Sequence, residues 1–249
     1  MKKYLYLFFG FMILVNFLQA EISVDEIVKK NIEACGGIKK LSSIKTTKVE
    51  AKFTLMGVEG PAVINQKRPN KMRIDVTFQG MQIVQAYDGK KAWIIMPFHG
   101  STDPQDMPET EAKSFINDAD FDGPLVDYKK KGHKVELLGK EDFEGTPIYK
   151  VKLTTKDGSI KTLYFDKEYF LLLKSVSTTK IQEKDVEKTE IYSDFKEVQG
   201  IMIPHSIKIT GEMFNIEMVF EKIEFNVDID DKIFNMPEKK VEKKEESKK

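Results

Sequence analysis

The segment 47–56 reads TKVEAKFTLM, and the segment 72–78 reads MRIDVTF. In both segments apolar and polar residues alternate with a period of two, which predicts a β-strand with one apolar face and one solvated face. The segment 149–154 (YKVKLT) repeats the pattern. Turn-forming pairs such as Gly60-Pro61 and Asp88-Gly89 separate such runs.

Working outward from these segments, the alternation and the turn signals together predict twelve strands. Their expected ranges are 47–56, 61–67, 71–79, 81–87, 91–96, 134–140, 147–155, 159–166, 170–180, 187–196, 202–210 and 213–226. Regular strands joined mostly by short loops indicate an antiparallel meander. The sequence therefore predicts a mainly β fold with a few helices, and the sheet need not close into a barrel.

One helix is expected before the first strand. Ser23 and Glu26 have the spacing of a capping box, and an apolar pattern continues from there. Gly36-Gly37 then ends the helix in the usual way. Leu41 and Ile44 indicate a short second turn of helix.

A long interruption divides the predicted strands, from Pro97 to Gly132. Pro104, Pro108 and Pro124 make it a poor strand, and the ranges 109–116 and 125–130 are expected to be short helices. A loop of this length inside a compact domain is usually either functional or disordered. Its apolar residues favour a segment that packs on the domain, such as a lid.

The two ends of the chain differ from the middle. Residues 1–20 combine Lys2 and Lys3 with an apolar run and the sequence Leu18-Gln19-Ala20, as in a cleaved secretory signal peptide. An uncleaved N-terminal anchor is the alternative. Residues 21–237 are expected to form a single domain. Residues 238–249 (EKKVEKKEESKK) have too little apolar surface to fold, and we expect a disordered charged tail.

Charge and cysteine content exclude some classes of function. Removing Lys2 and Lys3 with the leader leaves 38 basic and 40 acidic residues of the 40 and 40 in the whole chain, a formal charge of −2. A chain without basic excess is not expected to bind nucleic acid. The one cysteine, Cys35, cannot form an internal disulfide. It is expected to be a small buried residue at a helix end, with a reactive thiol as the alternative.

No residue pattern indicates catalysis. The three histidines lie on separate segments, and the sequence has no HExxH, GxSxG, Walker A or GxGxxG motif. The acids between Asp118 and Gly123 resemble the start of a calcium loop, but its twelfth position is Lys129 rather than glutamate. A solvated turn or a helix cap is the alternative. We therefore expect a protein that is not an enzyme, with no catalytic residue, no metal and no cofactor.

Large, adaptable apolar side chains are abundant in a chain that is 32% charged. It contains eleven methionines and seventeen phenylalanines. Methionine is flexible and polarisable, so it suits ligands of variable shape. Ordinary core packing explains the same composition, and both interpretations stay open on composition alone.

Three short motifs in the first part of the chain carry a family resemblance. They are Lys67-Arg68-Pro69-Asn70, the segment 87–93 (YDGKKAW), and Pro97-Phe98. Their order and spacing resemble the periplasmic outer-membrane lipoprotein carriers, or LolA-like lipoprotein-sorting family, although Met96 stands where that family often has asparagine. The resemblance covers residues 45–100 best and extends in outline to about residue 235.

The resemblance implies an incomplete antiparallel β-barrel, a strongly curved sheet with a helical lid over a hydrophobic cavity. It implies a monomeric periplasmic carrier of lipoprotein acyl chains, served by an inner-membrane release complex and an outer-membrane acceptor. Arg68 matches the family arginine that latches the lid; without the resemblance it is a solvated charge at a strand end. The expected cavity residues are Val49, Phe53, Leu55, Met72, Ile74, Val76, Phe78, Trp93, Ile95, Phe98, Phe115 and Phe121.

Two other functions remain open at this point. A lipid- or lipoprotein-sensing module that regulates a membrane partner would use the same scaffold. A carrier of another lipid, such as a glycolipid or an isoprenoid, would differ only in its ligand. An enzyme is the least expected of the possibilities.

Overall fold

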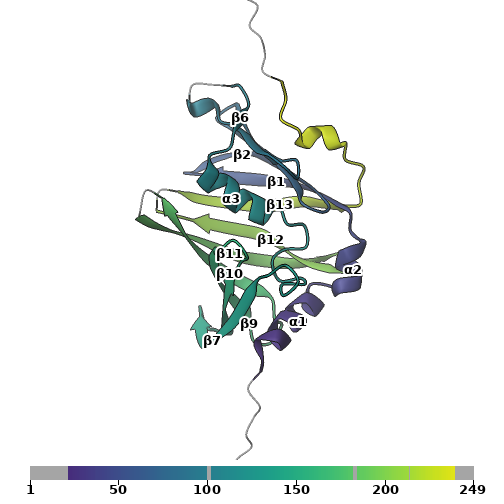
Figure 1. Ribbon diagram of the computed structural model, residues 1–249, viewed down its shortest axis with the longest axis vertical. Coiled ribbons are helices and arrows are strands. Elements are labelled where there is room, and N and C mark those ends of the chain that lie inside the picture. Colours follow the sequence, from purple (N-terminus) through teal and green to yellow (C-terminus); the bar gives the residue numbers. More distant parts are fainter. Residues whose placement is uncertain (1–21, 100–101, 182–183, 213, 239–249) are drawn as a thin grey trace, which may run out of the picture.

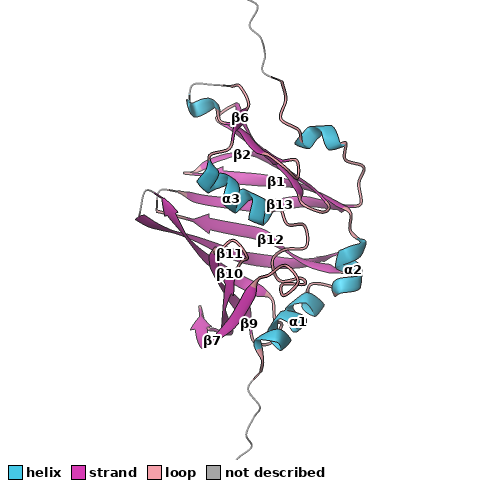
Figure 2. Ribbon diagram, in the orientation of Figure 1, coloured by secondary structure: helices cyan, strands magenta, loops and turns pink. Residues whose placement is uncertain are grey.

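The computed structural model describes residues 22–99, 102–181, 184–212 and 214–238. The expected leader (1–20) and all but Glu238 of the expected tail lie outside the described residues. Within the described residues, one antiparallel sheet of thirteen strands is accompanied by three α-helices (Figures 1 and 2). The prediction of a mainly β fold is confirmed.

The helices and strands follow one another along the chain in a simple order. The helices are α1 (Val24–Ala34), α2 (Ile38–Ser43) and α3 (Glu109–Asp118), with single 3-10 turns η1 (Pro97–His99) and η2 (Asp231–Phe234). The strands are β1 (Thr46–Leu55), β2 (Val58–Lys67), β3 (Lys71–Phe78), β4 (Met81–Tyr87), β5 (Ala92–Ile95), β6 (Gln105–Asp106), β7 (Lys134–Phe143), β8 (Thr146–Thr154), β9 (Ile160–Asp166), β10 (Leu172–Ile181), β11 (Lys184–Val198), β12 (Ile201–Thr210) and β13 (Asn215–Phe225).

The sheet consists of two meanders that share one central contact. Its strand order is β6-β5-β4-β3-β2-β1-β13-β12-β11-β10-β9-β8-β7, so β1 and β13 join the two meanders. β6 and β7 are the edges, and no hydrogen-bonded ladder joins them in the described part of the chain. The segment between these edges, which contains α3, therefore crosses the open side of the sheet (Figure 1).

The sheet curves strongly around the side that carries α3, as Figure 1 shows. Register shifts interrupt the ladders between Glu50 and Ala51 of β1, between Leu137 and Gly139 of β7, and between Leu172 and Lys174 of β10. Such bulges bend a strand and increase its local twist. The bent sheet therefore has a concave face, and α3 and the cavity described below lie on that side.

The helix α1 begins and ends where the sequence indicates. The Ser23 hydroxyl accepts a hydrogen bond of 3.2 Å from the Glu26 backbone N–H. At the other end, Gly36 has a φ of 114°, and a Cβ there would come within 2.7 Å of the Gly200 carbonyl oxygen. Glycine thus ends the helix and allows it to approach the turn between β11 and β12. Ile27 of α1 packs in a buried cluster with β8 and β9.

Two expectations for the segment 97–132 need correction. Residues 125–130 form turns rather than a helix, because Asp127 adopts a left-handed φ of 51° that interrupts helical hydrogen bonding. The segment also contributes the two-residue strand β6, which pairs with β5. The predicted helix over 109–116 is confirmed as α3. None of the described helices is long and apolar enough to cross a membrane.

Candidate ligand cavity

A cavity of about 640 Å³ lies between the concave face of the sheet and the segment that crosses it. Residues of both meanders line it, together with residues of α2, α3 and the turns after α3. Most of the lining is apolar. The apolar residues are Leu41, Ile44, Val49, Ile64, Met72, Ile74, Phe115, Phe121, Pro124, Leu163, Leu172, Ile201, Ile203, Ile207, Ile209, Phe220, Ile223 and Phe225.

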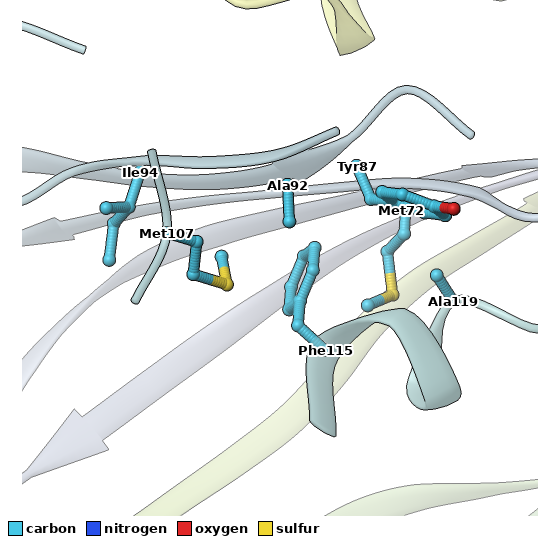
Figure 3. Close-up of a cluster of buried hydrophobic side chains, with 7 residues drawn as sticks. All are labelled: Met72, Tyr87, Ala92, Ile94, Met107, Phe115 and Ala119. Carbon is cyan, nitrogen blue, oxygen red and sulfur yellow. The ribbon is translucent and has the colours of Figure 1, made fainter. Parts of the chain in front are cut away.

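The helix α3 covers one end of this space. Phe115 points from α3 toward Met72 and Ala92 of the sheet (Figure 3). Met107, which precedes the helix, packs in the same cluster. The cluster includes two methionines, whose flexible side chains can adapt to different packing partners.

Ion pairs hold the end of α3 and the acidic segment after it, with partners in the turn after β2, within the covering segment itself and on β9. Asp122 pairs with Arg68 at 2.5 Å and Asp120 pairs with Lys131 at 2.5 Å. Asp118, the last residue of α3, pairs with Lys161 of β9 at 2.9 Å. Each of the three carboxylates thus pairs with a different cation rather than turning toward a common point, unlike the start of a calcium loop.

Arg68 connects this segment to the N-terminal helices. Its guanidinium donates to the Leu41 carbonyl at 2.8 Å and to the Ile44 carbonyl, and it binds the Asp122 carboxylate. It also lies over the Phe121 ring, with its central carbon 4.5 Å from the ring centre. The carbonyls that it binds belong to α2 and the residue after it, whereas the covering segment contributes a carboxylate and a ring. This geometry fits a latch between the two.

One wall of the cavity is charged, and sequence reasoning missed it. Lys188 and Glu190 of β11 pair at 3.0 Å. The Glu190 carboxylate also accepts hydrogen bonds from the Ser175 hydroxyl at 2.8 Å and the Tyr192 hydroxyl at 2.7 Å. Lys188 lies 3.8 Å from Asp118. We call Lys161, Ser175, Lys188, Glu190 and Tyr192 the polar wall.

The surroundings of the polar wall keep its charges in place. Burial alone would raise the pKa of Glu190, but the Lys188 charge and the hydrogen bonds from Tyr192 and Lys188 outweigh it and lower the pKa to about 2. Burial alone would lower the pKa of Lys188, yet Asp118 and Glu190 raise it. Burial, and after it the Glu190 charge, raises the pKa of Tyr192. At neutral pH Lys188 and Glu190 are therefore both charged, and Tyr192 is neutral.

The residues expected to line a cavity fall into three groups. Val49, Met72, Ile74, Phe115, Phe121 and the expected latch Arg68 line the cavity. Five others lie on the concave face beside the cavity, either by strand alternation or by packing against it. There the ring centres of Phe53 and Phe78 are 6.2 Å apart, and those of Phe78 and Phe98 are 5.7 Å apart. These five are Phe53, Leu55, Val76, Phe78 and Phe98. They fill that end of the concave face with their own side chains.

Trp93 and Ile95 form the third group, on the opposite face of the sheet. Trp93 is 1% exposed and packs with Val84 and Ala86, and Ile95 packs against this cluster. The indole N–H donates to the Phe234 carbonyl at 2.7 Å. The structure thus places these two residues under the C-terminal segment, away from the cavity.

Two residues singled out in the sequence have local structural contacts. The His133 ring accepts a hydrogen bond of 2.9 Å from the Lys156 backbone N–H, and burial lowers the pKa of this histidine. Cys35 is half-buried at the end of α1, where burial raises the pKa of its thiol. The thiol is therefore held in its protonated, less reactive form.

A family model described as "Uncharacterized protein" matches residues 78–238. The chain belongs to this family. The matched range runs from the end of β3 to the residues after η2, so it includes α3, the polar wall and the C-terminal segment. No curated protein sequence matches the chain.

Three solved structures share this fold over most of their length. A LolA superfamily protein from Nitrosomonas europaea has a TM-score of 0.59 at 17% identity, covering 86% of this chain and 98% of its own. A DUF1329 family protein from Desulfovibrio piger has a TM-score of 0.58 at 13% identity, covering 85% of this chain and 97% of its own. A domain named for outer-membrane lipoprotein sorting, from Vibrio parahaemolyticus, has a TM-score of 0.54 at 11% identity, covering 84% and 97%. At these identities the likeness shows a LolA-like fold.

Proposed function

We propose that this protein is a non-enzymatic periplasmic carrier that binds the acyl chains of lipoproteins, or of a related lipid, and moves them from the inner to the outer membrane. The observation that carries the proposal is the 640 Å³ cavity, whose walls are mostly apolar and whose open side is crossed by a helix held by ion pairs. The LolA-like fold supports the same role.

The size of the cavity suits a single acyl chain. An apolar cavity of about 150 Å³ holds benzene, with its six carbon atoms, so 640 Å³ has room for roughly 25 carbon atoms. One chain of about 16 carbons fits with space to spare. A lipid with two or three such chains needs a larger opening, which displacement of α3 would provide.

Apolar burial supplies the affinity, and the lid makes release possible. Each buried methylene contributes roughly 0.8 kcal/mol, so a chain of about 15 methylenes gains on the order of 12 kcal/mol. Such a ligand leaves slowly unless something replaces it. Phe115 of α3 packs on Met72 at the cavity wall, so closure of α3 competes with the acyl chain for this surface and weakens net binding.

The proposal includes the location and the partners of the carrier. Residues 1–20 direct export to the periplasm and are then removed. The monomeric carrier receives its ligand from a release complex of the inner membrane and gives it to an acceptor at the outer membrane. No covalent chemistry is needed in either step, because only burial of the acyl chain changes.

The proposal is tested by lipid extraction and by transfer. The chain is expressed with its leader, purified from the periplasm without detergent, and extracted for mass spectrometry. We expect co-purified acyl lipid or lipoprotein, and transfer of a fluorescent acyl lipid from donor to acceptor vesicles. Protein that is free of lipid and takes none from vesicles would overturn the proposal. Capture of a membrane-anchored regulator without lipid transfer would favour the sensing module instead.

A further inference from the structure

The polar wall has no evident purpose in a site that binds only hydrocarbon. Side chains of its residues line the same cavity as Ile207, Ile209 and Phe220. Burying charged groups beside apolar ones is costly unless they are paired. A cavity for an acyl chain alone would be better lined with apolar residues throughout, so the charged wall indicates a ligand with a polar end.

Asp118 occupies the position that such a polar end would take. It is the last residue of α3, its carboxylate lies 2.9 Å from the Lys161 ammonium, and it lies 3.8 Å from that of Lys188. Among the described residues, it is the one carboxylate with which Lys161 forms an ion pair. Glu190, by contrast, is already bound by Ser175, Tyr192 and Lys188.

Displacement of α3 changes the charge balance of this site. With α3 in place, Lys161 and Lys188 are balanced by Asp118 and Glu190. When the helix moves to admit a ligand, Asp118 leaves and the remaining three groups carry a net charge of +1. Lys161 and Lys188 have side chains only 18% and 27% exposed, so water compensates them poorly. An anion from the ligand would restore the balance.

We propose that Lys161 and Lys188 bind the anionic end of an acyl-chain ligand, a carboxylate or a phosphate, in the place that the Asp118 carboxylate occupies when α3 is closed. This inference rests on the proposed carrier function and selects, within it, ligands with an ionised end. The tail would then lie along β12, whose Ile207 and Ile209 are the partners of Tyr192 and Glu190 in the ladder. The anion of the ligand and the Asp118 carboxylate cannot occupy this place together, so binding of the ligand is coupled to opening of the lid.

The test compares ligands of equal chain length with and without a charge. Binding of palmitate, hexadecyl phosphate and hexadecanol is measured by displacement of a fluorescent acyl probe from the mature chain at neutral pH. The wild type should bind palmitate or hexadecyl phosphate about tenfold more tightly than hexadecanol. Preference for one anion over the other distinguishes a fatty acid from a phosphate ester.

Four variants separate headgroup binding from lid stability. Asp118→Asn should bind the anions about tenfold more tightly, because it frees both lysines, and Lys161→Gln should bind them about tenfold more weakly. Lys196→Gln is the matched control, since Lys196 pairs with Asp194 at an exposed position of β11. Asp122→Asn loosens the lid through Arg68 without freeing the lysines, so it should change affinity for palmitate and hexadecanol by the same factor. Melting curves confirm that each variant is folded.

The outcomes keep the two proposals distinct. If palmitate and hexadecanol bind equally and respond alike to Asp118→Asn and Asp122→Asn, Asp118 is a lid contact only and the inference is overturned, while the carrier function stands. If neither ligand displaces the probe and vesicle lipid is not taken up, the carrier function fails and the inference falls with it.

Discussion

The two faces of strands β3 to β5 have opposite kinds of packing. On the convex face Trp93 is 1% exposed beneath the C-terminal segment, whose own Phe234 is 0% exposed. On the concave face Met72 and Ile74 line a cavity of about 640 Å³ beneath a helix. One face is therefore closed by the chain's own packing, and the other retains a cavity, which is the proposed ligand site. Substitutions on the two faces should have separable effects on stability and on binding.

The largest effect is expected on the convex face, from Trp93→Ala. Removing a buried tryptophan costs about 3–5 kcal/mol, and urea denaturation monitored by circular dichroism measures the loss. Trp93→Phe keeps an aromatic ring but removes the donor to the Phe234 carbonyl, so its loss should be smaller, about 1–3 kcal/mol. Lipid affinity of the folded fraction should stay at the wild-type value. A Trp93→Ala variant that is fully stable but no longer binds lipid would reverse the roles assigned to the two faces.

The next largest effect is on the stability of the fold at acid pH, and it comes from the charged part of the concave face. The pKa of Glu190 is about 2 in the folded chain, against an ordinary value of 4.5. Because the folded pKa is the lower one, the ionised carboxylate stabilises the fold above pH 4.5, and this contribution is lost as the pH falls from 4.5 to 2. Its size is roughly 3 kcal/mol. Urea unfolding at a series of pH values should show a steeper acid limb for the wild type than for Glu190→Gln. Identical limbs would mean that Glu190 is not held ionised by its neighbours.

On the apolar part of the concave face, filling the cavity should affect binding more than stability. Ile74→Trp places a larger side chain in the space for the acyl chain, so we expect at least tenfold weaker binding, about 1.4 kcal/mol. The free energy of unfolding should change by less than that, because the added ring enters empty space. Lys52→Trp is the control, since Lys52 is an exposed residue of β1 paired with Glu59. Unaltered acyl binding by Ile74→Trp would place the ligand elsewhere.

The smallest effect is expected where α2 meets the segment that covers the cavity. Arg68→Lys retains the charge but loses the fork that binds Asp122 and the Leu41 carbonyl together. Because lid closure competes with the ligand, a loss of about 1 kcal/mol in lid closure should make the release of a fluorescent acyl lipid roughly fivefold slower. Arg68→Leu should fold and alter release further. Transfer at the wild-type rate by both variants would refute the latch.

Local patterns determined the elements of this fold well. The alternation of β1 and β3, the cap formed by Ser23 and the end of α1 at Gly36 are all short-range features, and each appears in the structure where it was predicted. The short strand β6 and the turns at 125–130 were missed. Two-residue pairing and a single left-handed residue, Asp127, leave little signal in a sequence.

Assignment of faces needed the tertiary structure. In β5, Ala92-Trp93-Ile94-Ile95 is apolar on both faces, so alternation cannot indicate which side chains face the cavity. Pairing with β4 decides it, because Trp93 lies opposite Ala86 on the convex face and Ala92 lies opposite Tyr87 on the concave one.

The polar wall is a second feature whose position the sequence pattern alone could not indicate. Lys188 and Glu190 are charged residues at alternate positions of β11, a pattern usual for a solvated face, and Lys161 shares a face with Leu163 in β9. The curvature of the sheet and the position of α3 bring all three charges together with Asp118 at the cavity. By itself the sequence determined where the strands and caps lie, since these depend on neighbours a few residues away. The pairing of β1 with β13 and the crossing of α3 decided what the concave face encloses, because those contacts join residues far apart in the chain.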